Sequence, residues 1–138
     1  MSLVVLGAVS GWMIVALVAT NISLPYLLRG RLLAANGWNV PYLERIRPHY
    51  WIGVTVAGLS LVHAGLAMSM AVRFDPLSTA GLWVGTGGML IAFAQAMVGM
   101  RMRTLRGAER VRLRRLHFRF MLALVATGVI HIVLNRPL

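Results

Sequence analysis

Four histidines form two equally spaced pairs in apolar stretches of the chain. His63 follows His49 by fourteen residues, and His131 follows His117 by fourteen residues. Fourteen steps of about 100° end close to a whole number of turns, so both histidines of a pair share one helix face, roughly 21 Å apart along the axis. Imidazole is the commonest metal ligand among side chains. The pattern therefore predicts two helices that each present two metal-binding rings at two heights.

Two such helices could hold two haems between them, because a haem iron takes its axial ligands from opposite sides. If the helices are parallel neighbours, His49 faces His117 and His63 faces His131. A metal ion bound only by protein is less favoured, since no carboxylate or cysteine lies near the four histidines in sequence. Four structural histidines that contact headgroups or neighbouring helices are the alternative, but they give no reason for the matched spacing.

The composition is that of an integral membrane protein. Of the 138 residues, 59% are hydrophobic and only 12% are charged, with a mean hydropathy of +0.76. These values exclude an ordinary soluble domain. The sequence contains no cysteine, which excludes disulfides, iron–sulfur clusters and covalently attached c-type haem. We therefore expect two haem b groups that are held without covalent attachment.

The hydropathy pattern predicts an all-α membrane protein, a single domain over residues 1–138 that forms a four-transmembrane-helix bundle. Pro48 suits the first turn of one helix, because the missing N–H of proline would be unpaired there. The first apolar stretch lacks the basic start and cleavage signal of a signal peptide, so it is expected to be a retained anchor. The expected helices are residues 3–28, 49–72, 77–100 and 116–135.

The placement of charge predicts the orientation in the membrane. All 14 basic residues are arginine, and most of them fall within residues 29–47 and 101–119. This clustering beside apolar stretches favours contact with membrane lipid and gives no reason to expect nucleic acid. By the positive-inside rule, the two arginine-rich connections are cytoplasmic and both termini lie outside. We expect a multi-pass protein of a bacterial inner (plasma) membrane.

Arginine could also bind the propionates of haem. Arg114 lies three residues before His117, and Arg45 and Arg47 approach the same cytoplasmic haem from the other side. On the outer side only Arg73 and Arg136 are available. The alternative for most of these arginines is that they fix topology and bind anionic lipid.

Two further features point to partners. The basic segment 101–115 is expected to be a cytoplasmic loop that docks an acidic redox partner protein. Gln95 lies in an apolar run, where its amide could bond to a neighbouring helix or to a cofactor edge. A quinone is a further candidate partner.

The two H-x13-H pairs, His49 with His63 and His117 with His131, resemble the membrane core of the ferric-reductase and NADPH-oxidase superfamily. More loosely, they resemble small bacterial di-haem cytochromes b. The resemblance implies that each histidine of one helix shares a haem with its counterpart on the other. That family usually has six helices and is often fused to a flavin and nicotinamide domain, whereas this sequence predicts four helices and has no glycine-rich nucleotide fingerprint.

These observations predict transmembrane electron transfer through two bis-histidine b-type haems, one near each membrane face. The chain would be the electron-transfer subunit of an oxidoreductase system, without its own flavin or nicotinamide domain. Two alternatives stay open. One is a quinone-linked cytochrome b subunit of a larger respiratory complex, and the other is a structural membrane subunit without haem.

Overall fold

The computed structural model describes residues 2–29, 44, 46–74 and 79–135. Within these residues the chain forms only α-helices, and no strand occurs among them. Their bounds are α1 Leu3–Arg29, α4 Arg47–Phe74, α5 Thr79–Met102 and α6 Gly107–Leu134. All four helices are long and apolar enough to cross a membrane. The expected all-α four-helix bundle of a multi-pass membrane protein is therefore confirmed.

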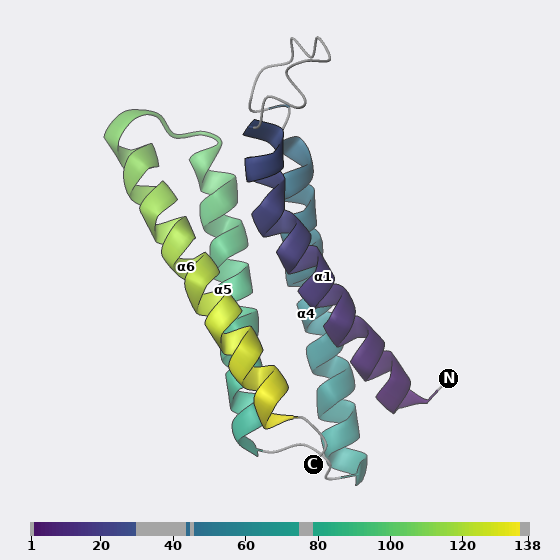
Figure 1. Ribbon diagram of the computed structural model, residues 1–138. Coiled ribbons are helices and arrows are strands. Elements are labelled where there is room, and N and C mark those ends of the chain that lie inside the picture. The colour runs from purple at the N-terminus through teal and green to yellow at the C-terminus, as the bar shows by residue number, and fades with distance from the viewer. Residues whose placement is uncertain (1, 30–43, 45, 75–78, 136–138) are drawn as a thin grey trace.

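The bundle consists of two helical hairpins packed side by side (Figure 1). Helix α1 packs on α4, α5 packs on α6, and α4 joins the hairpins by packing on α5. The two helices that carry histidines, α4 and α6, therefore lie diagonally opposite each other. Both run in the same direction, which is the parallel relation that the histidine pairs require.

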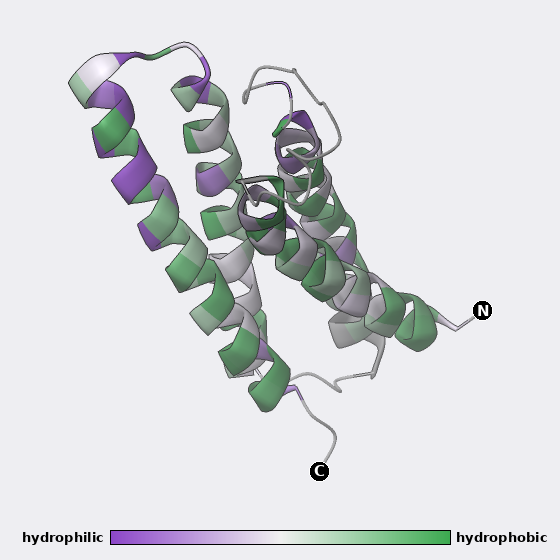
Figure 2. Ribbon diagram, turned by 45° about the horizontal axis from the view of Figure 1, so that its top comes forward, coloured by the Kyte–Doolittle hydropathy of each residue, from purple (hydrophilic) through white to green (hydrophobic). Residues whose placement is uncertain are grey.

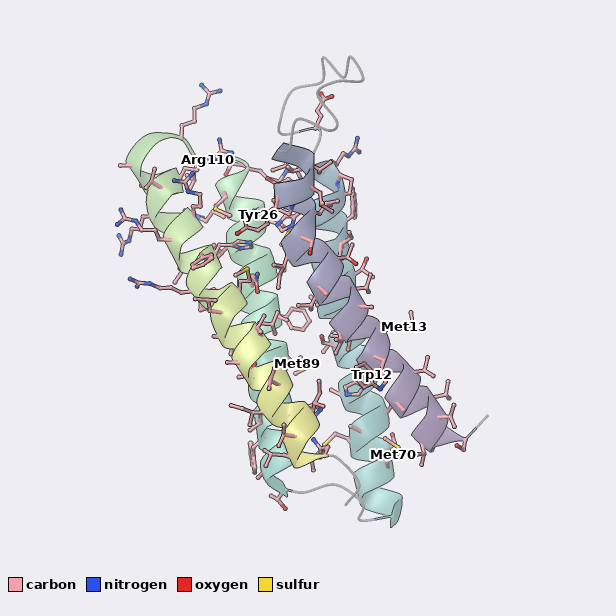
Figure 3. The ribbon with its side chains drawn as sticks, in the orientation of Figure 1. Trp12, Met13, Tyr26, Met70, Met89 and Arg110 are labelled. Atoms are coloured by element: carbon pink, nitrogen blue, oxygen red, sulfur yellow. The ribbon has the colours of Figure 1, made fainter. Side chains whose placement is uncertain are left out.

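One end of the bundle is marked by arginine. The connection between α5 and α6 lies at this end, and Arg110 projects from the first turns of α6 there (Figure 3). Hydrophilic residues gather on the same turns, whereas the rest of α6 is mostly hydrophobic (Figure 2). We call this end of the bundle the basic end. His49 and His117 lie near it, and His63 and His131 lie toward the opposite end.

Helix α6 begins earlier than the sequence predicted. It starts at Gly107 instead of residue 116, so only residues 103–106 of the segment 101–115 lie in the connection and the rest is helical. Gly107 takes φ +63°, a conformation that favours glycine, and this lets the chain reverse directly after the extended Arg106. Arginine and leucine are good helix formers, so the helix continues beyond the apolar stretch into the charged one. The expected loop was wrong because the apolar boundary was taken as the helix boundary.

The interior of the bundle is sparsely filled by side chains. In the described part of the chain, no large side chain is less than 2% exposed. The buried hydrophobic residues there are few and mostly small or medium in size, namely Ile46, Val56, Ala57, Met70 and Ala92. Protein interiors are normally close-packed, so this bundle has room for material other than its own side chains.

Candidate functional site

The two histidine pairs meet across the bundle as the spacing predicted. The ring centres of His49 and His117 lie 6.1 Å apart, with the ring planes at 68°. The ring centres of His63 and His131 also lie 6.1 Å apart, with the planes at 79°. We call the first pair the basic-end site and the second pair the far-end site.

This separation suits two imidazoles on one metal ion. A metal–imidazole bond is about 2.0–2.1 Å long and a ring nitrogen lies roughly 1.1 Å from its ring centre, so two rings bound in line have centres about 6.3 Å apart. The observed 6.1 Å in both pairs is close to this value. No group of three or more His, Cys, Asp or Glu side chains that could hold a metal occurs among the described residues. The sites therefore fit a metal that brings its remaining ligands with it, as haem iron does.

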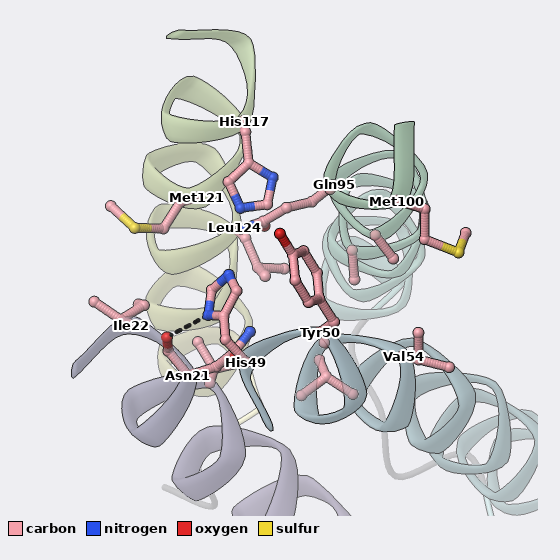
Figure 4. Close-up of a pocket in the computed structure, with 16 residues that line it drawn as sticks. Asn21, Ile22, His49, Tyr50, Val54, Gln95, Met100, His117, Met121 and Leu124 are labelled. Carbon is pink, nitrogen blue, oxygen red and sulfur yellow. Dashed lines mark hydrogen bonds between the residues drawn. The ribbon is translucent and has the colours of Figure 1, made fainter. Parts of the chain in front are cut away.

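Helix α1 fixes the orientation of both rings on α4. The Nδ1–H of His49 donates to the carbonyl oxygen of Asn21 at 2.9 Å (Figure 4). At the far-end site, the hydroxyl of Ser10 donates to the carbonyl oxygen of Gly7 at 2.9 Å. The same hydroxyl oxygen accepts the Nδ1–H of His63 at 3.0 Å. With the proton on Nδ1, Nε2 is the nitrogen left free to bind a metal.

The two rings on α6, His117 and His131, differ in their hydrogen bonds to helix α5. The Nδ1–H of His131 donates to the carbonyl oxygen of Gly81 at 2.9 Å. The backbone of Gln95 approaches His117, but within the described part of the chain the buried Nδ1 of His117 has no hydrogen bond of ordinary geometry. Three of the four rings are thus held by a fixed acceptor, an arrangement typical of histidines that bind metal.

Glycines face the rings on the neighbouring helices. A Cβ added to Gly85 would lie 2.8 Å from Cε1 of His131, and one added to Gly11 would lie 3.1 Å from Cε1 of His63. A Cβ added to Gly99 would lie 3.5 Å from Cε1 of His117, an ordinary contact. At the far-end site, the absence of a Cβ at Gly11 and Gly85 therefore leaves the space that the two histidine rings occupy.

A cavity surrounds the far-end site. It has a volume of about 450 Å³ and is lined by residues from all four helices, including Trp12, Ser60 and Gly85 beside the two histidines. This volume falls in the range of cofactor sites. The lining is mainly apolar, with few polar groups apart from the histidines and hydroxyls, as is usual for a site that holds a large flat organic group.

The basic-end site is tighter. Its cavity has a volume of about 50 Å³, which is room for very few water molecules. Tyr50 takes part of the space beside the histidines, with its ring centre 6.0 Å from that of His49 (Figure 4). The guanidinium of Arg103 lies over the Tyr50 ring at 5.1 Å. A cofactor as large as haem would require Tyr50 to move.

The arginines named from the sequence are less well placed than the histidines. Arg47 and Arg114 are exposed, and neither is among the residues that line the cavity of the basic-end site. Arg45 and Arg136 lie outside the described residues, as does the side chain of Arg73. Sequence reasoning missed Arg103 as a site residue, which reaches the site through its contact with Tyr50.

Sequence reasoning also missed the groups on α1 and α5 that hold the rings. A signal for them existed in the spacing of these helices. Gly7 and Asn21 are fourteen residues apart, as are Gly81 and Gln95, which matches the spacing of the histidines they approach. Each of the two helical hairpins thus pairs a holding helix with a histidine helix.

Comparisons with protein-family models, curated proteins and solved structures found no match for this chain. The resemblance to the ferric-reductase and NADPH-oxidase superfamily therefore rests on the two histidine pairs alone.

Proposed function

We propose that the protein is a membrane electron-transfer protein that holds two b-type haems without covalent attachment. His49 and His117 would bind one iron, and His63 and His131 the other. The observation that carries this proposal is the equal 6.1 Å separation in both pairs, close to the distance expected for rings that share one metal ion. The sparsely filled interior and the cavity of about 450 Å³ give independent support.

The haem irons would supply the one-electron chemistry, and the chain would set where and in what surroundings they work. With two histidines bound to it, each iron would keep no open site for a small ligand, which would favour electron transfer over oxygen binding. The Nδ1 hydrogen bonds of His49, His63 and His131 would make these three imidazoles stronger ligands and hold their planes. The apolar helices around the sites exclude water.

The two sites lie fourteen residues apart along α4 and along α6, which is roughly 21 Å of helix. This span would carry an electron between the two faces of a membrane whose hydrocarbon core is about 30 Å thick. By the positive-inside rule, the arginines of the basic end favour a cytoplasmic location for that end, with both termini outside. In a bacterial plasma membrane, electrons would pass between a cytoplasmic donor or acceptor and the outer face.

The donor or acceptor on the cytoplasmic side would be an acidic protein. Six arginines of the basic end, Arg101, Arg103, Arg106, Arg112, Arg114 and Arg115, are exposed. Several of them stand on a helix that extends past the apolar stretch, so they form a charged projection that could steer a partner of opposite charge. Neutralising Arg106, Arg110 and Arg112 together should reduce the rate of electron transfer with such a partner at low salt. An unchanged rate would show that docking does not occur there.

Electron transfer across a membrane can be tested in sealed lipid vesicles. The purified protein is inserted, a soluble electron acceptor is enclosed, and an impermeant reductant is added outside. The proposal predicts reduction of the enclosed acceptor, and loss of that reduction in the His63→Ala variant. Haem reduction that responds to a quinone analogue, with no transfer to the enclosed acceptor, would favour the quinone-linked subunit instead.

A further inference from the structure

Pro25 stands inside α1 and does not end it. A proline in a helix has no N–H to donate to the carbonyl four residues before it, and its ring crowds that carbonyl. For Pro25 that carbonyl belongs to Asn21. The Asn21 oxygen is also the one that accepts the Nδ1–H of His49 at 2.9 Å. The Asn21 carbonyl oxygen therefore lacks the helical N–H donor that it would otherwise have from residue 25, and it accepts the bond from His49.

The second hairpin offers a natural comparison. Gln95 on α5 stands where Asn21 stands on α1, fourteen residues after the glycine whose backbone lies near the far-end site. Four residues after Gln95 comes Gly99, which has an N–H, whereas four residues after Asn21 comes Pro25. His117, the ring that Gln95 approaches, has no hydrogen bond of ordinary geometry on Nδ1. The bond beside the proline has ordinary geometry, whereas the approach beside the glycine does not.

We propose that Pro25 is a positioning residue for the basic-end site, which acts by freeing the Asn21 carbonyl to hold His49. This inference rests on the proposed haem ligation. A carbonyl relieved of its helical donor accepts the imidazole N–H more strongly, which makes His49 a stronger electron donor to iron. A stronger donor stabilises the oxidised iron, so the bond lowers the reduction potential of the basic-end haem.

The test is a redox titration of the two haems in the full-length protein and in the Pro25→Ala variant, followed by absorbance. The N–H of alanine would compete for the Asn21 carbonyl. We expect the reduced-to-oxidised ratio of the basic-end haem at a fixed potential to rise about tenfold, which is 59 mV for one electron. The far-end haem should not change. The two haems are assigned with His117→Ala and His131→Ala, each of which removes one of them.

Two further variants control the test. Ser23→Ala changes an exposed side chain of α1 close to Pro25, whose hydroxyl donates to the carbonyl of Ala19 on the same helix, so the potential should stay at the wild-type value. Pro25→Gly also restores an N–H and should shift the potential in the same direction as Pro25→Ala. Circular dichroism and the thermal unfolding midpoint check that the variants fold, and alanine at a helix interior should leave the midpoint unchanged or higher.

The outcomes separate this inference from the proposed function. Two outcomes would support the positioning role: a shift in the potential of the basic-end haem alone, or loss of that haem alone from a folded Pro25→Ala protein. Equal shifts of both haems, or no shift of either, would overturn it, because a general effect of the proline on helix shape would not select one site. A wild-type protein without haem would instead refute the proposed function.

Discussion

The far-end and basic-end sites each have a pair of histidines at the same separation but different surroundings. At the far-end site, both rings donate to fixed acceptors and a cavity of about 450 Å³ lies around them. At the basic-end site, His49 has a hydrogen bond of ordinary geometry on Nδ1, whereas His117 has only the weaker approach of the Gln95 backbone, and the cavity is about 50 Å³. The comparison teaches that α4 and α6, which carry the histidines, set the spacing of the sites. Helices α1 and α5 determine how the rings of each site are hydrogen-bonded.

The largest expected effect is the loss of one site without the other. His131→Ala should remove the far-end haem and leave the basic-end haem, and His117→Ala should do the reverse, since each iron depends on its own pair. Haem content per chain should fall from two to one in each variant. If either variant lost both haems while remaining folded, the two sites would not be independent.

The glycine facing His131 provides the next test. In Gly85→Ala, the new Cβ would lie 2.8 Å from Cε1 and 2.9 Å from Nδ1 of the ring, so the ring must move away from Gly81. We expect the affinity of the far-end site for haem to fall about 10- to 100-fold, the usual cost of disturbing the groups that orient a metal ligand. Titration of haem into the purified haem-free protein would measure it.

Gly87 is the matched control for this change. It lies on the same helix, and a Cβ added there meets nothing within 4 Å. Gly87→Ala should bind haem as the wild type does. Equal losses in the two alanine variants would mean that α5 tolerates no substitution and that the contact with His131 is not the cause.

A smaller effect is expected from the hydroxyl that holds His63. Ser10→Ala removes the acceptor of the Nδ1–H, so the far-end haem should become easier to reduce while the basic-end haem keeps its potential. Ser60 is buried in the wall of the same cavity, but its hydroxyl donates to the carbonyl of Val56 on its own helix. Ser60→Ala should therefore leave both potentials unchanged, and a similar shift in both serine variants would speak against a specific bond.

The smallest effect is expected at Gln95. Its Oε1 is buried in the wall of the basic-end cavity and has no hydrogen-bond partner among the described residues. Replacing an unpaired polar group by an apolar one of similar size costs little. Gln95→Leu should therefore keep two haems per chain and a thermal unfolding midpoint no lower than that of the wild type. Loss of the basic-end haem would show that the amide contacts the cofactor.

Much of the fold could be predicted from the sequence, because long apolar runs have few structures open to them in a membrane. The first helix was expected at residues 3–28 and is observed at Leu3–Arg29. The start of α6 was misplaced by nine residues, since charged helix formers extend a helix without any change in hydropathy. Helix ends outside the apolar layer depend on local turn chemistry, here the positive φ of Gly107.

The histidine pairs could also be predicted, because a ligand side chain and its helical period are both visible in a sequence. The groups that hold the rings were harder to find. Two of them, at Asn21 and Gly81, are backbone carbonyls, which every residue possesses. Only the packing of one helix on another decides which carbonyl meets a ring. The connection of Pro25 to His49 becomes visible only when α1 lies beside α4.

The most direct test of the central claim is the haem content of the purified wild-type protein. Haem and protein are quantified in the same sample, together with a reduced-minus-oxidised absorbance spectrum. The account predicts two b-type haems per chain, both low-spin because each iron has two histidine ligands. A colourless protein that also takes up no haem when haem is added would contradict the account and return the four histidines to a structural role.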